Sequence, residues 1–163
     1  MRPELTKRAD YAIRAMLSLA WADDDRPRSA RRIAAEMGIP VRFLPQVMAD
    51  LGRAGLVTAE AGRNGGHRLA RSAAQIDLLE IIEAVEGNDR RRSCVLRGGP
   101  CDPNGECAVH AVFAAAQSSL RETFAGADLA TIAARGSADG QSGGRLERTA
   151  PSATSQPAAT VRP

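Results

Sequence analysis

Three cysteines and a histidine lie within a short stretch of this sequence. Cys94, Cys101 and Cys107 are spaced C-x6-C-x5-C, and His110 follows the third cysteine as C-x2-H. Thiolates are soft, anionic donors that suit iron–sulfur clusters and zinc. Three thiolates leave one coordination position open, and His110 is the nearest candidate for it. Because an odd number of cysteines cannot form a closed set of disulfides, the pattern indicates metal or redox chemistry.

Other interpretations of these residues stay open beside the iron–sulfur cluster. Three cysteines and one histidine are also a donor set of structural zinc sites. The cysteines could instead be free thiols in a loop that sense metal or oxidant directly. The spacing approaches that of the CCCH zinc fingers that bind RNA, but both outer gaps are too short and no aromatic residues for base stacking surround it. Zinc is therefore the main alternative cofactor.

The first half of the chain predicts a winged helix-turn-helix. Apolar periodicity predicts helices over residues 5–22, 30–37 and 41–53, the last two joined by a tight glycine turn. Residues 56–59 and 67–70 read as two short strands around a glycine-rich loop, which is a β-hairpin pattern. In this layout the second helix of the pair enters the DNA major groove.

The start of the helix over residues 41–53 carries side chains that face away from its apolar stripe. Arg42 could donate two hydrogen bonds to guanine, and Gln46 could pair with adenine. Phe43 lies between them and is a further candidate for DNA contact. Arg53 lies too far along the helix for the bases and is expected to contact phosphate.

The hairpin loop offers a second set of DNA-contacting candidates. Arg63 and Asn64 stand between glycines at its tip. The negative potential of a minor groove attracts a guanidinium group, so these two residues could enter it. His67, on the second strand, is expected to be structural or to face solvent rather than to bind a metal.

The net charge of +3 is unevenly distributed along the chain. Residues 26–71 carry nine basic and three acidic side chains, a net of +6. Residues 72–135 have a net of −3, residues 1–25 a net of −1, and residues 136–163 a net of +1. One basic block is typical of a surface that meets phosphates, and a solvated arginine-rich face is the alternative.

Two further helices are predicted in the C-terminal half. Asp77, with Glu80 as its capping-box partner, begins one that Gly87 ends. The other covers about residues 107–124 and has an apolar stripe too long for so small a domain to cover, which suggests a dimerisation helix. The stripe consists of Val109, Val112, Phe113, Ala116, Leu120 and Phe124.

The fold class expected is therefore mainly α with a small β-hairpin wing. The 163 residues divide into a winged helix-turn-helix head (1–87), a cysteine loop (88–107), a dimerisation helix (108–135) and a disordered tail (136–163). No apolar stretch of membrane-spanning length and no secretory signal are present, so no membrane partner is expected. No nucleophile is paired with a base, and no loop could cradle phosphate, so an enzyme is not expected.

Several segments, in this order, resemble the IscR/NsrR-type (Rrf) family of bacterial winged-helix regulators, across about 130 residues. No single motif is decisive, but the ordered set is highly specific. The matching segments are LTKRADYAIRAML (5–17), LGRAGLV (51–57), GRNGGHRLA (62–70), IDLLEIIEAVEG (76–87) and CAVH (107–110).

The resemblance implies a homodimeric, cytoplasmic transcription regulator, usually a repressor. Its iron–sulfur cluster, [2Fe–2S] or [4Fe–4S], would tune binding to double-stranded operator DNA in response to nitric oxide, redox state or cluster supply. Cys94, Cys101 and Cys107 match the three cluster cysteines, although the first gap is one residue longer than usual. His110 matches the fourth ligand of the IscR-like branch. Asp10 matches that of the NsrR-like nitric-oxide sensors, where the partner subunit donates it. His110 is favoured because it needs no partner chain.

Overall fold

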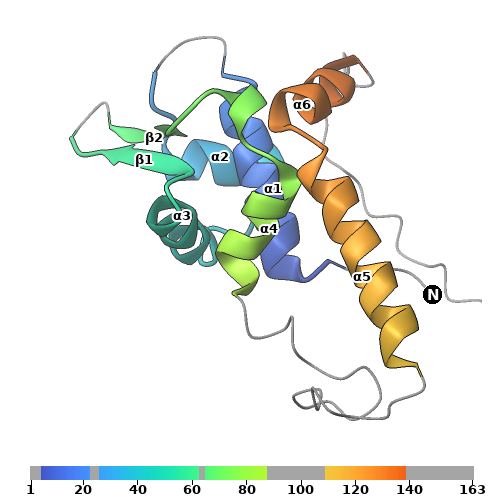
Figure 1. Ribbon diagram of the computed structural model, residues 1–163. Coiled ribbons are helices and arrows are strands. Elements are labelled where there is room, and N and C mark those ends of the chain that lie inside the picture. The colour runs from blue at the N-terminus through green and yellow to red at the C-terminus, as the bar shows by residue number, and fades with distance from the viewer. Residues whose placement is uncertain (1–4, 23–25, 63–64, 88–108, 139–163) are drawn as a thin grey trace, which may run out of the picture.

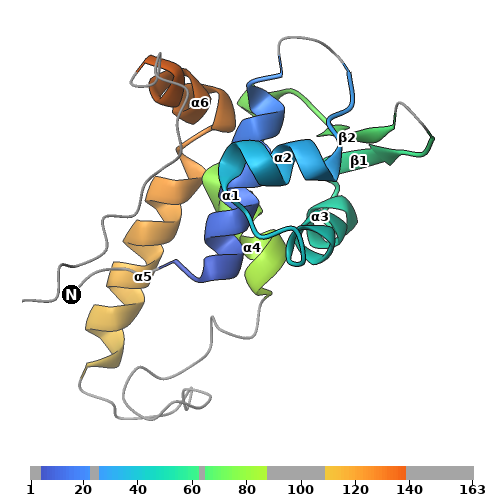
Figure 2. The ribbon, with the colours of Figure 1, turned by 180° about the vertical axis from the view of Figure 1, so that it is seen from behind.

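The computed structural model describes residues 5–22, 26–62, 65–87 and 109–138. Within these ranges helices dominate and one hairpin is present, which confirms the predicted fold class (Figure 1). In both views the hairpin lies on one side of the head, and α5 and α6 lie on the other (Figures 1 and 2). The elements are α1 (Lys7–Ala20), α2 (Ala30–Met37), α3 (Leu44–Arg53), β1 (Val57–Glu60), β2 (Gly66–Leu69), the 3-10 helix η1 (Ala73–Gln75), α4 (Leu78–Glu86), α5 (His110–Ala125) and α6 (Leu129–Ala138).

Side-chain caps fix the starts of three helices. The hydroxyl of Thr6 accepts a hydrogen bond from a backbone N–H in the first turn of α1, and Ser29 does the same for α2. Asp77 and Glu80 form the predicted capping box at α4, with bonds of 2.8 and 3.2 Å. Such caps satisfy N–H groups that have no partner inside the helix.

The helix-turn-helix consists of α2 and α3. Gly38 ends α2 with φ of 62°, a left-handed conformation that favours glycine. Helix α3 begins at Leu44, three residues later than predicted, because the N–H of Phe43 donates to the carbonyl of Pro40 at 2.9 Å and closes a turn first. Pro45 falls in the first turn of α3, where its missing N–H removes no helical bond.

The two strands are displaced by one residue from their predicted positions. They are antiparallel, with Val57 opposite Leu69. Leu56 precedes β1 instead of opening it, because its N–H donates to the carbonyl of Leu51 at 3.0 Å and its side chain is buried. The hairpin is thus attached directly to the end of α3.

A third segment lies along the outer edge of β2. Arg28 and His67 exchange two backbone hydrogen bonds, each of 2.8 Å. A Cβ atom on Gly66 would lie only 2.5 Å from the carbonyl oxygen of Arg28, so the pairing requires glycine there. The chain between α1 and α2 therefore holds the wing against the helices.

Helix α1 packs against α2, α3, α4 and α6. Its buried alanines Ala9, Ala12 and Ala15 are small enough for neighbouring helices to approach closely. The larger fully buried side chains of the core come from the four helices of the head, from positions beside β1 and η1, and from α6: Met16, Ile33, Leu44, Leu51, Leu56, Ile76, Ile81 and Leu129.

The structure has two helices, α5 and α6, where one helix was expected over residues 108–135. Helix α5 ends at Ala125, close to the predicted 124, and α6 starts after a break. The break is held by Ile76, whose carbonyl accepts from the N–H of Leu129 at 2.8 Å, and by Leu78, whose N–H donates to Ala127 at 3.0 Å. Helix α6 extends to residue 138, into the expected tail, and residues 139–163 lie outside the described ranges.

Candidate nucleic-acid interface and cysteine site

Four predicted DNA-contacting residues lie on the outer side of α3 and the turn before it. Arg42, Phe43, Gln46 and Arg53 are all exposed, while the opposite side of α3 is buried in the core. We call the surface formed by these four residues, together with their neighbours Arg8 and Tyr11 on α1, the reading face.

Aromatic stacking organises the start of the reading face. The ring of Tyr11 stacks on that of Phe43 at a centroid distance of 5.7 Å. The guanidinium of Arg42 lies over the same Phe43 ring, 4.7 Å from its centroid, within the range of cation–π contact. Tyr11 lies three residues after Arg8 on α1, so both can share one side of that helix.

A buried carboxylate lies behind the reading face. The side chain of Asp50 is 1% exposed and forms ion pairs with Arg8 and Arg53. Gln46 Nε2 donates to Asp50 Oδ1 at 3.0 Å. Two of the predicted contact residues, Gln46 and Arg53, are therefore held by one acidic group, together with an arginine that lies 42 residues earlier in the chain.

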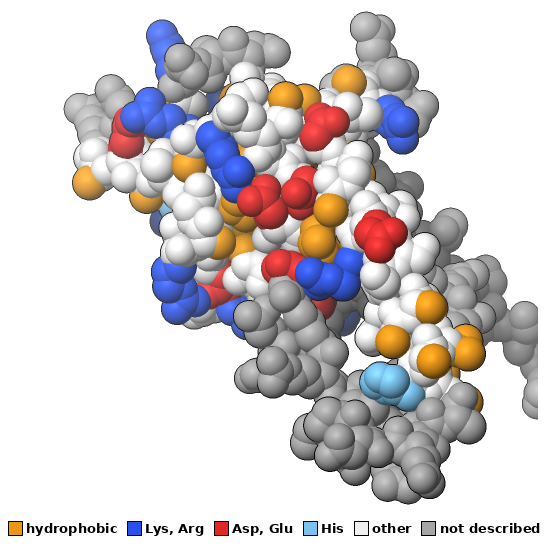
Figure 3. All heavy atoms as spheres, viewed as in Figure 1, with side chains coloured by type: hydrophobic (Ala, Val, Ile, Leu, Met, Phe, Trp, Pro, Cys, Tyr) orange, Lys and Arg blue, Asp and Glu red, His pale blue; other side chains and the backbone are white. Residues whose placement is uncertain are grey.

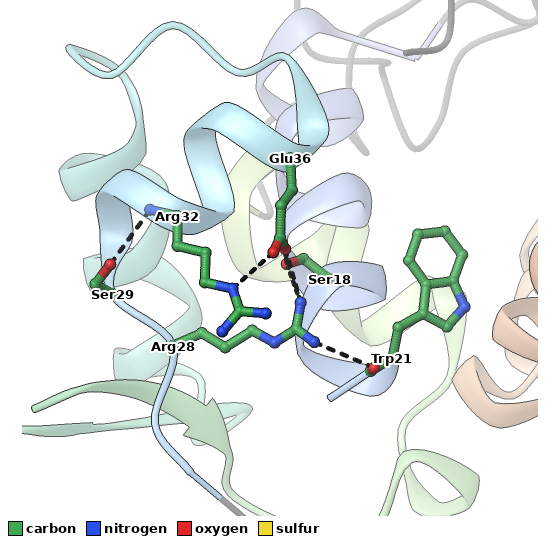
Figure 4. Close-up of polar contacts among 6 residues, drawn as sticks. All are labelled: Ser18, Trp21, Arg28, Ser29, Arg32 and Glu36. Carbon is green, nitrogen blue, oxygen red and sulfur yellow. Dashed lines mark hydrogen bonds and ion pairs between the residues drawn. The ribbon is translucent and has the colours of Figure 1, made fainter. Parts of the chain in front are cut away.

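One arginine of the basic block is part of the fold instead of a binding surface. Arg28 is 12% exposed and donates to Glu36 Oε2 at 2.7 Å and to the carbonyl of Trp21 at 3.2 Å (Figure 4). Ser18 and Arg32 also donate to Glu36. Burial alone would raise the pKa of Glu36, but these hydrogen bonds and the charges of Arg28 and Arg32 hold it below its ordinary value.

The described carboxylates of residues 26–71 are all engaged by arginine. Beside Glu36 and Asp50, Glu60 pairs with Arg68 across the hairpin. Arg31 and Arg42 are exposed and make no ion pair with a carboxylate of the described residues. Among the described residues of this block, the excess positive charge therefore lies on α2 and the reading face.

The tip of the wing, Arg63 and Asn64, lies outside the described residues. The glycines on either side are described, and the N–H of Gly65 donates to the carbonyl of Gly62 at 3.0 Å. His67, on β2, is half-buried, and burial lowers its pKa. That placement agrees with the expectation of a structural histidine.

The predicted cysteine ligands, Cys94, Cys101 and Cys107, also lie outside the described residues. His110 is the first residue of α5 and is exposed. Asp10, the alternative fourth ligand, lies on α1 and pairs with Arg14 Nε at 2.7 Å. No group of three metal-binding side chains occurs within the ranges that the structure describes. The two fourth-ligand candidates thus lie on different helices, Asp10 on α1 and His110 on α5.

Helix α5 displays an apolar surface with little cover from the rest of the described chain. None of its residues is buried, and Val112 is 69% exposed. Val109 and Leu120 are exposed as well, whereas Phe124 packs against the core. Hydrophobic side chains gather over α5 in the space-filling view (Figure 3). Exposed apolar patches that extend along an element typically mark interaction sites.

Comparison with known proteins identifies the family of this chain. The family model of Rrf2, described as an iron-dependent transcriptional regulator, matches residues 5–135. The chain belongs to the Rrf2 family. The match runs from the start of the head through the cysteine segment and α5 into α6, most of which it covers.

Individual Rrf2 relatives support this membership. The chain is 36% identical over 132 residues to a putative HTH-type transcriptional regulator, ORF2, of Azotobacter vinelandii, covering 80% of this chain and 79% of that protein. It is 33% identical to the HTH-type transcriptional regulator IscR of Cronobacter sakazakii, covering 67% of each chain. The solved structure of T. potens IscR superimposes with a TM-score of 0.69 at 25% identity, covering 85% of this chain and 92% of that one.

The protein is thus a DNA-binding transcriptional regulator of the Rrf2 family, IscR-like, and not an enzyme. This agrees with the sequence-based expectation. None of the helices in the described ranges is long and apolar enough to cross a bilayer. Sequence reasoning missed Arg8, Tyr11 and Asp50. The link of Asp50 to Gln46 and Arg53 could have been predicted from the sequence, because residues three and four apart are neighbours on a helix. The link to Arg8 could not, because it depends on the packing of α1 against α3.

Proposed function

We propose that this Rrf2 regulator is a homodimeric cytoplasmic repressor whose operator binding is controlled by an iron–sulfur cluster. One observation carries the proposal. The three cysteines lie in the chain between the end of α4, in the DNA-binding head, and His110, which opens the exposed apolar helix α5. A group bound there would act on the segment that joins the two functional parts.

The DNA-binding part of the proposal rests on the reading face and the wing. Arg42 and Gln46 would read base edges in the major groove, Phe43 would add apolar contact, and Arg53 would contact phosphate. Arg63 and Asn64 would enter the minor groove from the wing.

Dimerisation rests on the apolar surface of α5. Two copies that bury Val109, Val112 and Leu120 against each other would remove these side chains from water, which is favourable in proportion to the apolar area covered. The dimer would present two reading faces to half-sites about 34 Å apart, one turn of DNA. A change in the spacing of the two heads would then lower operator affinity.

The donor set fits an iron–sulfur cluster. Cys94, Cys101 and Cys107 supply thiolates, which are the usual ligands of such clusters, and the fourth ligand would be His110 or Asp10. A cluster would supply redox chemistry and reactivity toward nitric oxide and oxygen. His110 is favoured because it follows Cys107 by three residues in the same chain and needs no partner subunit to place it.

The cluster is tested by anaerobic purification of the full-length chain, with iron, sulfide and zinc assays and a visible spectrum. The proposal expects a coloured protein that contains iron and sulfide, and loss of the colour in Cys94→Ser, Cys101→Ser and Cys107→Ser variants. The spectra of His110→Ala and Asp10→Ala identify the fourth ligand, because only the true ligand's variant changes. A nitric-oxide titration of the spectrum tests the signal.

A second candidate is a zinc- or thiol-based sensor on the same winged-helix fold. The three cysteines with His110 also form a Cys₃His donor set, which zinc accepts in structural sites. Colourless protein with stoichiometric zinc would replace the cluster by this candidate. Operator binding that survives all three cysteine variants unchanged would exclude both.

A further inference from the structure

Asp50 is a buried acidic residue directly behind a surface that must attract phosphates. A carboxylate buried in this way is unfavourable unless it is paired and hydrogen-bonded. Here three donors compensate it, and all three belong to the reading face: Arg8 from α1, and Gln46 and Arg53 from α3. The carboxylate therefore links the first turn of α1 to both ends of the exposed side of α3.

The two arginines keep most of their hydrogen-bonding capacity. The side chain of Arg8 is 47% exposed and that of Arg53 is 73% exposed. A guanidinium carries five N–H donors, and each of these two uses one terminal nitrogen on Asp50. Each can therefore keep its bond to Asp50 while it donates to a phosphate, with less loss of side-chain entropy than an unrestrained arginine.

Asp50 also fixes the orientation of the Gln46 amide. A carboxylate only accepts hydrogen bonds, so it is the NH₂ group of Gln46 that points to Asp50, and the amide oxygen points away. One N–H of that group stays available, which leaves the donor and acceptor pair that adenine requires.

We propose that Asp50 is a positioning residue for DNA binding, which holds Arg8 and Arg53 as a pair of phosphate clamps and orients Gln46 between them. Arg8, on the first helix, is then a phosphate-contacting residue in addition to those on α3 and the wing. This inference rests on the proposed assignment of the reading face.

The test uses the full-length protein and a fluorescent duplex selected by it from a random-sequence pool, with a random duplex of equal length. Anisotropy titrations over a series of KCl concentrations give the affinity and its salt slope. Arg8→Gln and Arg53→Gln are each expected to reduce the slope by about 0.9 for each phosphate that the variant no longer neutralises. Arg121→Gln, which removes an arginine paired with Glu83 on the far side of the head, is the matched control and keeps the slope.

Asp50→Asn separates positioning from charge. The variant raises the positive charge by one, so charge alone predicts tighter binding to any DNA. Positioning predicts binding of the selected duplex about tenfold weaker. Glu122→Gln on α5 makes the same charge change away from the reading face and should not weaken binding. Thermal unfolding of each variant shows whether it is folded at the titration temperature.

The outcomes are distinct. If Asp50→Asn binds as tightly as Glu122→Gln and Arg8→Gln retains the wild-type slope, the proposal is overturned. Should Asp50→Asn not fold, the slope of Arg8→Gln decides alone, since that side chain is exposed. If the wild type selects no duplex and binds neither DNA, the proposed function is wrong, because the reading face does not bind DNA. That outcome differs from failure of the Asp50 proposal, in which the protein binds DNA but Asp50 does not affect the binding.

Discussion

The indole Nε1 of Trp21, at the end of α1, donates a 2.9 Å hydrogen bond to the backbone carbonyl of Ala133 in α6. The carbonyl of Trp21 in turn accepts from Arg28, whose backbone pairs with His67 in the wing. A Cβ atom on Gly136 would lie 2.8 Å from Cζ2 of the same indole. Trp21 thus connects α6 to the wing through Arg28, which contacts both Trp21 and His67.

Gly136→Ala is expected to destabilise the protein by about 1–2 kcal/mol, because the new methyl group must displace the Trp21 ring or shift α6. Gly126→Ala is the matched control. Its Cβ would lie 3.4 Å from the nearest atom, so it should be neutral or slightly stabilising. Urea unfolding midpoints at constant slope measure the difference. Equal stabilisation by both substitutions would show that the α6 contact with Trp21 is loose.

Arg28→Gln is expected to cost about 2–4 kcal/mol, because it removes a mostly buried cation that Glu36 and the Trp21 carbonyl both use. Arg31→Gln makes the same charge change at an exposed position of α2 and should remain within about 0.5 kcal/mol of wild type. The free energy of unfolding in urea checks both. A loss for Arg28→Gln as small as that of Arg31→Gln would mean that the network in Figure 4 contributes little.

Stability should decrease as the pH falls below about 6.5, the ordinary pKa of histidine, because burial lowers the pKa of His67 in the folded state. The unfolded chain then binds the proton more readily than the folded one, and protonation favours unfolding. The decrease should level off below the folded-state pKa. Glu36 and Asp128 have lowered pKa values, so their effects appear only at more acidic pH.

Urea unfolding of wild type and His67→Gln between pH 5 and pH 8 tests this dependence. The glutamine variant should lose the part of the slope between pH 5 and pH 7. Parallel curves for the two proteins would show that His67 does not titrate differently in the folded state.

Val112→Asp is expected to convert the proposed dimer into a folded monomer, because a charge in the centre of an apolar interface loses its hydration. Ala114→Asp is the control, since two residues correspond to about 160° around the helix and place it off the apolar stripe. Sedimentation velocity gives the oligomeric state, and circular dichroism the helical content. A Val112→Asp protein that stays dimeric would place the interface elsewhere.

Features set by short-range contacts could be predicted from the sequence. The glycine turn between α2 and α3 and the Asp77 capping box depend on contacts within a few residues, and the structure confirms both. The predicted start of α3 is three residues early because apolar periodicity does not detect the turn that Phe43 closes.

Features set by tertiary contacts could not be predicted in this way. The break between α5 and α6 depends on the hydrogen bond from Leu129 to Ile76, which lies 53 residues earlier in the chain. Gly126 is the strongest helix-breaking residue near the break, and it does not by itself predict the end of a helix. The charge pattern groups Arg28 with the surface arginines, but its side chain is mostly buried. The sequence does not show this, because the backbone pairing of Arg28 with His67 is a tertiary contact. Arg8 joins the reading face for the same kind of reason, through Asp50.

The central claim, that a cluster on Cys94, Cys101 and Cys107 controls DNA binding, is tested most directly by one comparison. Anisotropy titrations of the selected duplex are made under anaerobic conditions with the protein as isolated and after removal of its cluster by nitric oxide or chelation. The account predicts that the two dissociation constants differ by at least about tenfold, or about 1.4 kcal/mol. Identical dissociation constants, from a protein whose iron and sulfide content has demonstrably changed, would contradict it.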